Sequence, residues 1–467
     1  MFFEVLSHAA LHIRSSGVSL ITDPWLVGST DWRSWWNYPP PRRDVVDALR
    51  PDFIYLTHIH WDHFQGPSLR KLGKGTPVII PRGPHDRMKR DLLAMGFKDI
   101  IELDHGETFR IHRDFAATSY HFGPFLDSAL VVEAEGVTLF NANDAKLMGA
   151  PLQQVLARHP RIDFVFRSHS SANGRLCYEV VDAAGAPVDD IEGYIAGFAK
   201  FVRRTGARYA VPFASNHCFL HRDVFALNTT IQTPRMVEDH FRKHGITSPA
   251  LKVMLSGDSW STDAGFSISA EAARYFDDRT AMLERCRDEN RDKLEKFYAL
   301  EARTRLSRDD LDKYFSAFAA VIPAVLRRLF RGRPITYALD GAERYVFEVD
   351  LDRGAVEQRR EPRETAEGPL EIHTSAFILR QCMALDLFCH LPISKRVRYR
   401  VSKRTRRYIQ VLNYLFNLVE YGWLPLDRSL RLSTARQLAP RWREGLLMAQ
   451  LLRDVALGRG LSVARYL

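Results

Sequence analysis

A short apolar segment that ends in three histidines and one aspartate limits the folds open to this chain more than any other feature. Residues 53–57 read Phe-Ile-Tyr-Leu-Thr, and His58, His60, Asp62 and His63 follow directly. Apolar and aromatic residues of this kind are typical of a buried strand. A strand of this kind is rigid, so side chains at its end can converge on a common point. The pattern therefore predicts a strand-end site rather than a surface cluster of histidines.

The residue types of this segment indicate a metal centre. Neutral imidazoles bind zinc, iron and manganese, and carboxylate oxygens suit the harder ions. We expect His58 and His60 to face one metal ion, and Asp62 and His63 to face a second. Two ions about 3.5–4 Å apart can share a hydroxide and hold a reacting oxygen between them.

The first 270 residues alternate between short apolar runs and amphipathic helical patterns. This alternation predicts a layered α/β fold, and the pattern changes to helical and charge-rich sequence after about residue 270. We therefore expect a catalytic domain over 1–270 and a mixed, mainly helical domain over 271–467. The strands expected in the first domain are Val18–Thr22, Phe53–Thr57, Pro77–Pro81, Ala129–Glu133, Val137–Asn141, Phe164–Arg167 and Tyr209–Pro212, and the helices are Arg87–Met95, Leu152–Arg158 and Tyr194–Thr205.

A dinuclear centre needs further ligands, and three later strand ends offer them. His121 lies between two expected strands and is the natural third histidine for the first metal. Asp144 ends another strand, and its two oxygens can bridge both ions. His217 and His221 both follow the strand Tyr209–Pro212, and one of them should complete the second metal.

In this order, the motif and the later residues resemble the ligand set of the metallo-β-lactamase superfamily. The resemblance implies an αββα sandwich for residues 1–270 and a two-metal site. It also implies that Asp23, in Leu20-Ile-Thr-Asp23-Pro-Trp, supports the metal-binding histidines from behind. A ligating imidazole commonly donates its other N–H to such a carboxylate.

Within the superfamily, residues 2–266 are most similar to the corresponding part of CMP-N-acetylneuraminate hydroxylase-like proteins, and similar in layout to the N-acyl-phosphatidylethanolamine phospholipase D group. Asp23-Pro-Trp-Leu, His121 followed by Asp127, and Pro212-Phe-Ala-Ser-Asn-His-Cys-Phe-Leu-His221 carry this resemblance. It implies that His221, rather than His217, is the last ligand. The hydroxylases also carry a Rieske iron–sulfur domain, which requires paired Cys and His, and this sequence has no such pairs.

Other residues near these strand ends are candidates for a supporting or substrate-binding role. His169 and Asn173 follow the strand Phe164–Arg167, and Arg167 itself can pair with a carboxylate or phosphate. His217 would take a supporting position if His221 is the ligand. The tryptophans before the motif, Trp25, Trp32, Trp35 and Trp36, either line the substrate pocket or pack in the core.

The second half of the chain gives fewer functional signals. Asp309–Phe330, Tyr345–Leu351 and Glu371-Ile-His-Thr-Ser resemble a sterol-carrier-like module; a helical packing or dimerisation domain is the alternative. We expect a surface loop at Glu357–Gly368, a solvated basic face at Lys395–Arg407 and a helix at Leu412–Trp423.

Charge and cysteine usage bear on the partners. The 66 Lys and Arg residues against 56 Asp and Glu give a net charge of +10, which favours an anionic small-molecule substrate. The five cysteines form no CxxC pair, so we expect a reduced, cytoplasmic protein. No nucleic-acid-binding module is recognisable, and peripheral membrane contact and oligomeric state stay open.

Two functions follow from the site. The first is a hydrolase that acts on an anionic or phosphate-bearing substrate through a metal-bridging hydroxide, with Asp62 and Asp144 as catalytic residues. The second is a diiron oxygenase that receives electrons from a separate reductase. The sequence slightly favours the hydrolase, and two divalent ions of zinc, iron or manganese serve either function.

Overall fold

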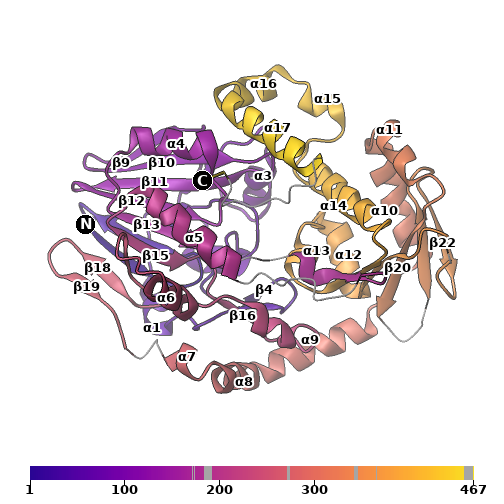
Figure 1. Cartoon of the computed structure of the whole chain (residues 1–467), viewed down its shortest axis with the longest axis horizontal. Helices are drawn as coiled ribbons and strands as arrows, with labels where there is room; N and C mark the ends of the chain where they lie inside the picture. The colour runs from indigo at the N-terminus through magenta and orange to yellow at the C-terminus, as the bar shows by residue number, and fades with distance from the viewer. Residues whose placement is uncertain are drawn as a thin grey trace.

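The computed structural model of the chain describes residues 1–170, 172, 174–183, 192–270, 274–340, 345–363, 365–456 and 466–467. Figure 1 shows two lobes, the first formed by the N-terminal half of the chain and the second by strands and helices of the C-terminal half. Helices that follow residue 274 run along the lower side of both lobes, and the last helices cross above them.

Two stacked sheets form the centre of the first lobe, and their facing sides share an apolar core that includes Phe3, Tyr55, Phe115 and Phe166. The first sheet contains, in spatial order, β19 (Gly265–Ser267), β18 (Ser259–Ser261), β1 (Phe2–Val5), β2 (Leu11–Ser15), β3 (Val18–Thr22), β6 (Phe53–Tyr55), β7 (Val78–Pro81) and β8 (Ile100–Leu103). The second contains β17 (Ala250–Leu251), β15 (Tyr209–Phe213), β13 (Phe164–Ser168), β12 (Val137–Asn143), β11 (Asp127–Ala134), β10 (Phe115–Phe122) and β9 (Thr108–His112).

Helices cover the outer face of each sheet and complete an αββα sandwich. Val46, Leu69 and Leu92 pack helices against the first sheet, and Val155 and Phe198 pack helices against the second. The first group is α1 (Arg43–Ala48), α2 (Gly66–Leu72) and α3 (Arg87–Ala94), and the second is α4 (Gly149–Arg158), α5 (Glu192–Thr205) and α6 (Pro234–Lys243). The start of α6 shows how the sequence sets a helix boundary. The Thr233 side chain caps the helix, and Pro234 occupies its first turn.

Parallel pairing brings several strand ends to one edge of the sandwich. β3 and β6 are parallel in the first sheet, and β12, β13 and β15 are parallel in the second. Because parallel strands end on the same side, the loops after β6, β12, β13 and β15 meet there. The motif 58–63 follows β6, so the fold places it at this edge. A small sheet of β16 (His217–Phe219), β5 (Trp35–Asn37) and β4 (Ser29–Thr30) lies beside these loops.

The second lobe contains a sheet as well as helices. Its strands, in order, are β14 (Tyr178–Val180), β24 (Val397–Val401), β23 (Leu370–Ser375), β20 (Ile335–Asp340), β21 (Val346–Asp350) and β22 (Ala355–Arg359). The helices of the C-terminal half are α7 (Arg274–Asp277), α8 (Arg279–Glu289), α9 (Arg291–Arg303), α10 (Arg308–Val321), α11 (Ala324–Arg327), α12 (Ala376–Leu385), α13 (His390–Ile393), α14 (Arg406–Glu420), α15 (Leu426–Ser429), α16 (Leu432–Leu438) and α17 (Trp442–Ala456).

Two segments cross the expected boundary at residue 270. Strand β14 leaves the first domain and pairs in parallel with β24 of the second. In the other direction, Leu447 of α17 belongs to the apolar cluster that residues of α4 and α5 also form. The division at residue 270 and the resemblance to a sterol-carrier module stay predictions.

The strands and helices expected in the first domain are all present within one to three residues. Two expectations for the second half need correction. Glu357–Gly368 is not entirely a loop, because β22 extends to Arg359. The basic segment 395–407 is not simply a solvated face, because Lys395 and Arg396 are buried. In the part of the chain that the structure describes, no helix is long and apolar enough to cross a bilayer.

Candidate metal centre

One buried carboxylate, Asp23, fixes the loop that follows β6. Asp23 Oδ1 accepts a hydrogen bond from the backbone N of Thr57 at 2.8 Å. Asp23 Oδ2 accepts from Thr57 Oγ1 at 2.8 Å and from His63 Nδ1 at 2.9 Å. Because Nδ1 of His63 is used in this way, its Nε2 is the atom that faces the site. Asp23 therefore holds the ring of His63 from the side opposite Nε2, and its role behind a metal ligand stays a prediction of the resemblance.

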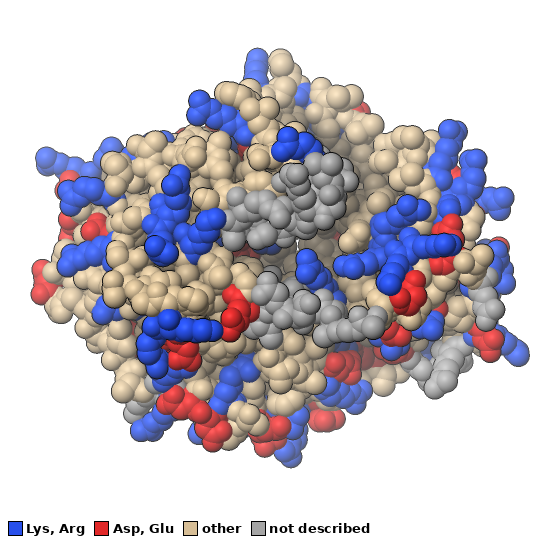
Figure 2. Space-filling model, in the orientation of Figure 1, with Lys and Arg blue, Asp and Glu red and all other residues tan. Residues whose placement is uncertain are grey.

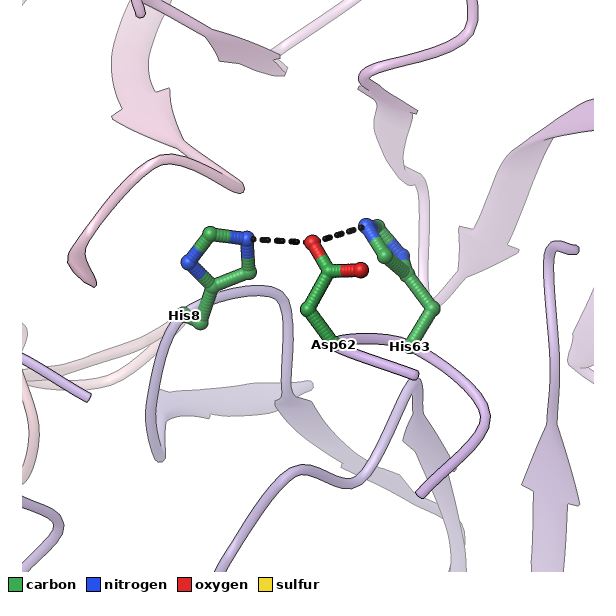
Figure 3. A group of neighbouring side chains, drawn as sticks. All are labelled: His8, Asp62 and His63. Carbon is green, nitrogen blue, oxygen red and sulfur yellow. Dashed lines mark ion pairs between the residues drawn. The ribbon is translucent and has the colours of Figure 1, made fainter. Parts of the chain in front are cut away.

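The structure gathers the motif residues into two adjoining groups of potential metal ligands. The first group is His8, Asp62 and His63 (Figure 3). Asp62 Oδ2 lies 3.1 Å from His8 Nε2 and 3.5 Å from His63 Nε2. In each group the ligand atoms all lie within 4.8 Å of one another, which is a spacing that one cation can span.

The second group is His58, His60 and Asp144. His58 Nε2 and His60 Nδ1 face each other at 2.9 Å. Asp144 lies between the groups, because its Oδ2 is 3.6 Å from His58 Nε2 and its Oδ1 is 3.7 Å from His63 Nε2. One oxygen of Asp144 thus faces each group, as a bridging carboxylate requires.

The donor set fits two divalent cations. His63 Nε2 and Asp144 Oδ1 are buried, and neither has a hydrogen-bond partner among the described residues. A buried polar atom without a partner costs free energy of about 1–3 kcal/mol, and a cation beside these atoms would remove that cost. Imidazole nitrogens and carboxylate oxygens together suit zinc, manganese or iron.

The ionisable groups of the site depend strongly on one another. Burial alone would raise the pKa of Asp62, but the neighbouring His63 and His8 hold it well below its usual range. Burial alone would lower the pKa of His63, but the carboxylates of Asp144, Asp62 and Asp23 raise it to about 10. The pKa of His60 lies well below its usual range because the ring is buried and His58 is close. The carboxylates thus produce a field that attracts cations.

A third carboxylate, Asp127, also belongs to this region. It begins β11, and the charges of His58 and Asp144 both act on it. Burial raises the pKa of Asp127, with Asp144 adding to the effect and His58 opposing it. The sequence indicates Asp127 only as part of a resemblance, and Asp127 belongs to neither group of potential metal ligands among the described residues.

Two of the expected ligands are not brought into either group. The ring of His121 packs against His105, although its buried Nε2 has no partner among the described residues. His221 is committed elsewhere, because its Nε2 lies 3.2 Å from Glu301 Oε2 and its Nδ1 lies 3.5 Å from Asp223 Oδ2. Both nitrogens of His221 therefore face carboxylates of a different cluster, and its assignment as the last ligand stays a prediction.

His217 lies closer to the site than His221. Its ring stacks on Trp35 with centroids 3.8 Å apart, and its Nδ1 donates to the Ser215 carbonyl at 3.1 Å. The centroid of its ring is 5.6 Å from that of His8. Burial, followed by the charge of His8, holds the pKa of His217 well below its usual range. His217 thus flanks the first ligand group.

The remaining candidates differ in their surroundings. Arg167 is buried, donates to the Ala145 carbonyl at 2.7 Å and lies over the Phe201 ring, so it holds the backbone next to Asp144. His169 is buried, and burial together with His8 lowers its pKa to about 3. Asn173 lies outside the described residues.

His8 is the ligand candidate that the sequence reasoning missed. It lies in the turn between β1 and β2, in Ser7-His8-Ala9, and is 1% exposed. The available signal was its position, since it lies shortly after a strand. A lone histidine at a strand end carries little weight without its neighbours, and only the fold brings residue 8 beside residue 62.

Comparison with known proteins agrees with this geometry. A family model described as a β-lactamase superfamily domain matches residues 20–212. A putative Rieske 2Fe-2S iron-sulfur protein of Mycolicibacterium smegmatis is 28% identical over 239 residues, which cover 48% of this chain and 45% of that protein. Cytidine monophosphate-N-acetylneuraminic acid hydroxylase of Xenopus laevis is 30% identical over 152 residues, covering 30% of this chain and 25% of the relative. The chain thus spans less than half the length of these curated relatives.

A hydrolase and a hydroxylase are among the solved structures to which part of this chain is similar. Isothiocyanate hydrolase from Delia radicum gut bacteria matches with a TM-score of 0.41 and 16% identity, covering 56% of this chain and 99% of that one. CmlA, a diiron β-hydroxylase from Streptomyces venezuelae, matches with a TM-score of 0.38 and 15% identity, covering 55% of this chain and 53% of that one. With its αββα sandwich, its strand-end ligands and the family match, the segment 20–212 belongs to the metallo-β-lactamase superfamily.

Proposed function

We propose that this chain is a dinuclear metal-dependent hydrolase. The observation that carries the proposal is the position of Asp144, whose two oxygens face the two ligand groups at 3.6 and 3.7 Å. When bound, two divalent ions would polarise a substrate oxygen and lower the pKa of water to near neutrality. His58, His60 and Asp144 would hold one ion, and Asp62, His63, His8 and Asp144 the other.

The protein residues contribute position and charge to this reaction. Asp23 and Thr57 fix the rings of His63 and His58 through the hydrogen bonds at Nδ1, so each ring turns Nε2 towards the site. The Asp144 side chain is about one-third exposed, although its Oδ1 atom is buried, so part of this carboxylate is accessible to water. No separate protein base is required if the reacting water is activated at the centre.

An anionic substrate suits the surroundings of the centre. Lys146 is exposed two residues after Asp144 and lies close enough to act on the Asp127 carboxyl. In Figure 2, Lys and Arg side chains predominate over the upper part of the visible face. The net charge of +10 adds a long-range attraction for anions. We therefore assign a phosphate-bearing or other anionic small molecule as the substrate class.

A diiron oxygenase is the second candidate, and Asp127 favours it. With Asp62 and Asp144 it makes a carboxylate-rich centre, and oxygen donors shift preference towards harder ions such as iron and manganese. The curated relatives named above are a Rieske iron–sulfur protein and a hydroxylase. In this function, a separate reductase would supply electrons to the centre.

Metal analysis followed by two assays separates the candidates. The full chain is purified without added metal and analysed by mass spectrometry, and then tested with bis(p-nitrophenyl) phosphate and, after chemical reduction, for O₂ uptake. Two zinc or manganese ions with phosphodiester cleavage that is lost in Asp144→Asn support the hydrolase. Two iron ions with O₂ uptake that is lost in the same variant support the oxygenase. A chain that binds no metal even when metals are added contradicts both.

A further inference from the structure

One histidine of the second lobe, His390, lies next to the metal centre. His390 begins α13 and is 0% exposed. Its Nδ1 lies 2.8 Å from Oδ1 of Asp31, which is also 0% exposed and comes from the first domain. The Nε2 atom of His390 is buried and has no hydrogen-bond partner among the described residues. The pair therefore joins the two lobes and leaves one imidazole nitrogen unused.

This arrangement repeats the one that positions His63. In both pairs a fully buried aspartate accepts from Nδ1, at 2.9 Å for Asp23 and His63 and at 2.8 Å for Asp31 and His390. Both aspartates have a left-handed backbone, with φ of 41° and 50°. Among the described residues, neither histidine has a hydrogen-bond partner for its buried Nε2. A side chain held so firmly, with one polar atom left over, is oriented towards a ligand.

His390 lies beside the second ligand group but outside it. Its ring centroid is 5.7 Å from that of His60 and 4.6 Å from that of Trp61. Neither group of potential metal ligands includes His390. Trp32 packs edge-on against the other side, with centroids 6.5 Å apart. These rings hold His390 next to His60, one of the residues of the second ligand group.

We propose that His390 is a substrate-contacting residue whose Nε2 accepts a hydrogen bond from a ligand held at His58, His60 and Asp144; this inference rests on the dinuclear site proposed above. Asp31 Oδ1 accepts the hydrogen bond from Nδ1, so in the tautomer that carries this single N–H the Nε2 atom holds the lone pair. The preferred ligand therefore has an O–H or N–H next to its metal-binding oxygen, as a phosphate monoester does when singly protonated.

Phosphate and sulfate form a matched pair of probes for this hydrogen bond. At a pH of about 8 both are tetrahedral dianions of similar size. Only phosphate carries an O–H group that can donate a hydrogen bond to Nε2 of His390. The full chain is loaded with Co²⁺, and binding of each anion is followed by the visible absorption of the metal. The measured quantity is the ratio of the two dissociation constants, since general effects on anion binding cancel in it.

We expect the parent protein to prefer phosphate, and His390→Ala to reduce that preference by about fivefold or more, which corresponds to the net value of about 1 kcal/mol for one hydrogen bond. His390→Gln, which keeps an acceptor, should retain part of the preference. Asp31→Asn keeps the ring but removes the charge that selects its tautomer, so the preference should also fall. All three variants should still bind two metal ions per chain.

An unchanged ratio in His390→Ala and in Asp31→Asn, with both metal ions retained, overturns the role of His390 and leaves the dinuclear centre standing. Loss of metal from His390→Ala together with normal metal content in His390→Gln also overturns it, because the residue would then act on the centre itself. A parent protein that binds no Co²⁺ overturns the proposed function, and this inference with it.

Discussion

The two lobes contribute to the site in different ways. In the first, His58, His60, Asp62 and His63 follow one strand, and Asp144 ends another. In the second, His390 lies on a four-residue helix, in sequence that resembles no motif. The first lobe thus carries ligands whose spacing is set by local structure, while the second carries a residue that only tertiary packing brings to the site.

This difference follows from how each position is determined. A motif on one loop keeps its geometry because its residues are neighbours in the chain, and the ends of parallel strands meet by the rules of sheet topology. Asp31 and His390 are 359 residues apart. Their contact depends on the docking of the lobes, which also relies on Arg87, because this side chain donates to the carbonyls of Leu385 and Glu420.

The largest effect should come from the first lobe alone. We expect the double variant His58→Ala/His60→Ala to lose most of its metal and all detectable activity while the fold persists, because both residues lie on a loop outside the core strands. Mass spectrometry gives the metal content and circular dichroism the fold. His112→Ala, at an exposed position of β9, is the matched control. Full metal occupancy in the double variant would contradict the assignment of the centre.

Asp144→Asn tests the connection between the two ligand groups. The change keeps the shape but removes the charge that faces both groups, so we expect metal affinity to fall by about 10- to 100-fold, the size seen when ligand surroundings are altered, and activity to fall with it. Titration with Zn²⁺ or Fe²⁺ measures the affinity. Asp99→Asn, an exposed position, controls for charge. Activity within a few-fold of the parent would show that Asp144 is not a bridge.

His221 shows what a local sequence pattern does not determine. The motif 58–63, the strand ends and Asp144 follow from local patterns. His221 was inferred from a resemblance through its segment, but the fold turns it towards Glu301, which also pairs with Arg396 at 2.8 Å. No local pattern encodes that buried cluster, because it joins residues from three distant segments. For the same reason, the sequence does not predict that His8 lies beside Asp62 and His63.

His8→Ala and His221→Ala separate these two roles. We expect His8→Ala to lose about one metal ion per chain, because its Nε2 lies 3.1 Å from Asp62 Oδ2. We expect His221→Ala to keep both ions but to melt at a lower temperature, since it leaves Glu301 and Asp223 with one partner fewer. Metal counts and thermal denaturation on the same samples separate the two roles. One ion lost from His221→Ala, with His8→Ala unaffected, would support His221 as the last ligand.

The smallest effect concerns the docking of the lobes and its dependence on pH. Glu420 ends α14 and is 3% exposed, with both carboxylate oxygens 3.1 Å from the backbone N of Cys389. Burial raises its pKa from 4.5 to about 8, although the hydrogen bonds from Cys389 and the charge of Arg87 oppose the shift. The folded protein thus holds a proton that the unfolded chain releases near pH 4.5.

The contribution of Glu420 to stability is therefore full below about pH 4.5 and is lost as pH rises towards 8, because over that range the folded state binds more protons than the unfolded state. Histidines titrate in the same range, so the informative quantity is the difference between the parent and Glu420→Gln, which keeps the shape but cannot ionise. We expect the variant to unfold at nearly the same temperature as the parent at pH 5, and a few degrees higher at pH 8. Glu361→Gln, at an exposed position, should show no such trend. A constant difference between Glu420→Gln and the parent from pH 5 to pH 8 would show that Glu420 does not keep its proton in the fold, and that the lobes dock around an ionised carboxylate beside Arg87.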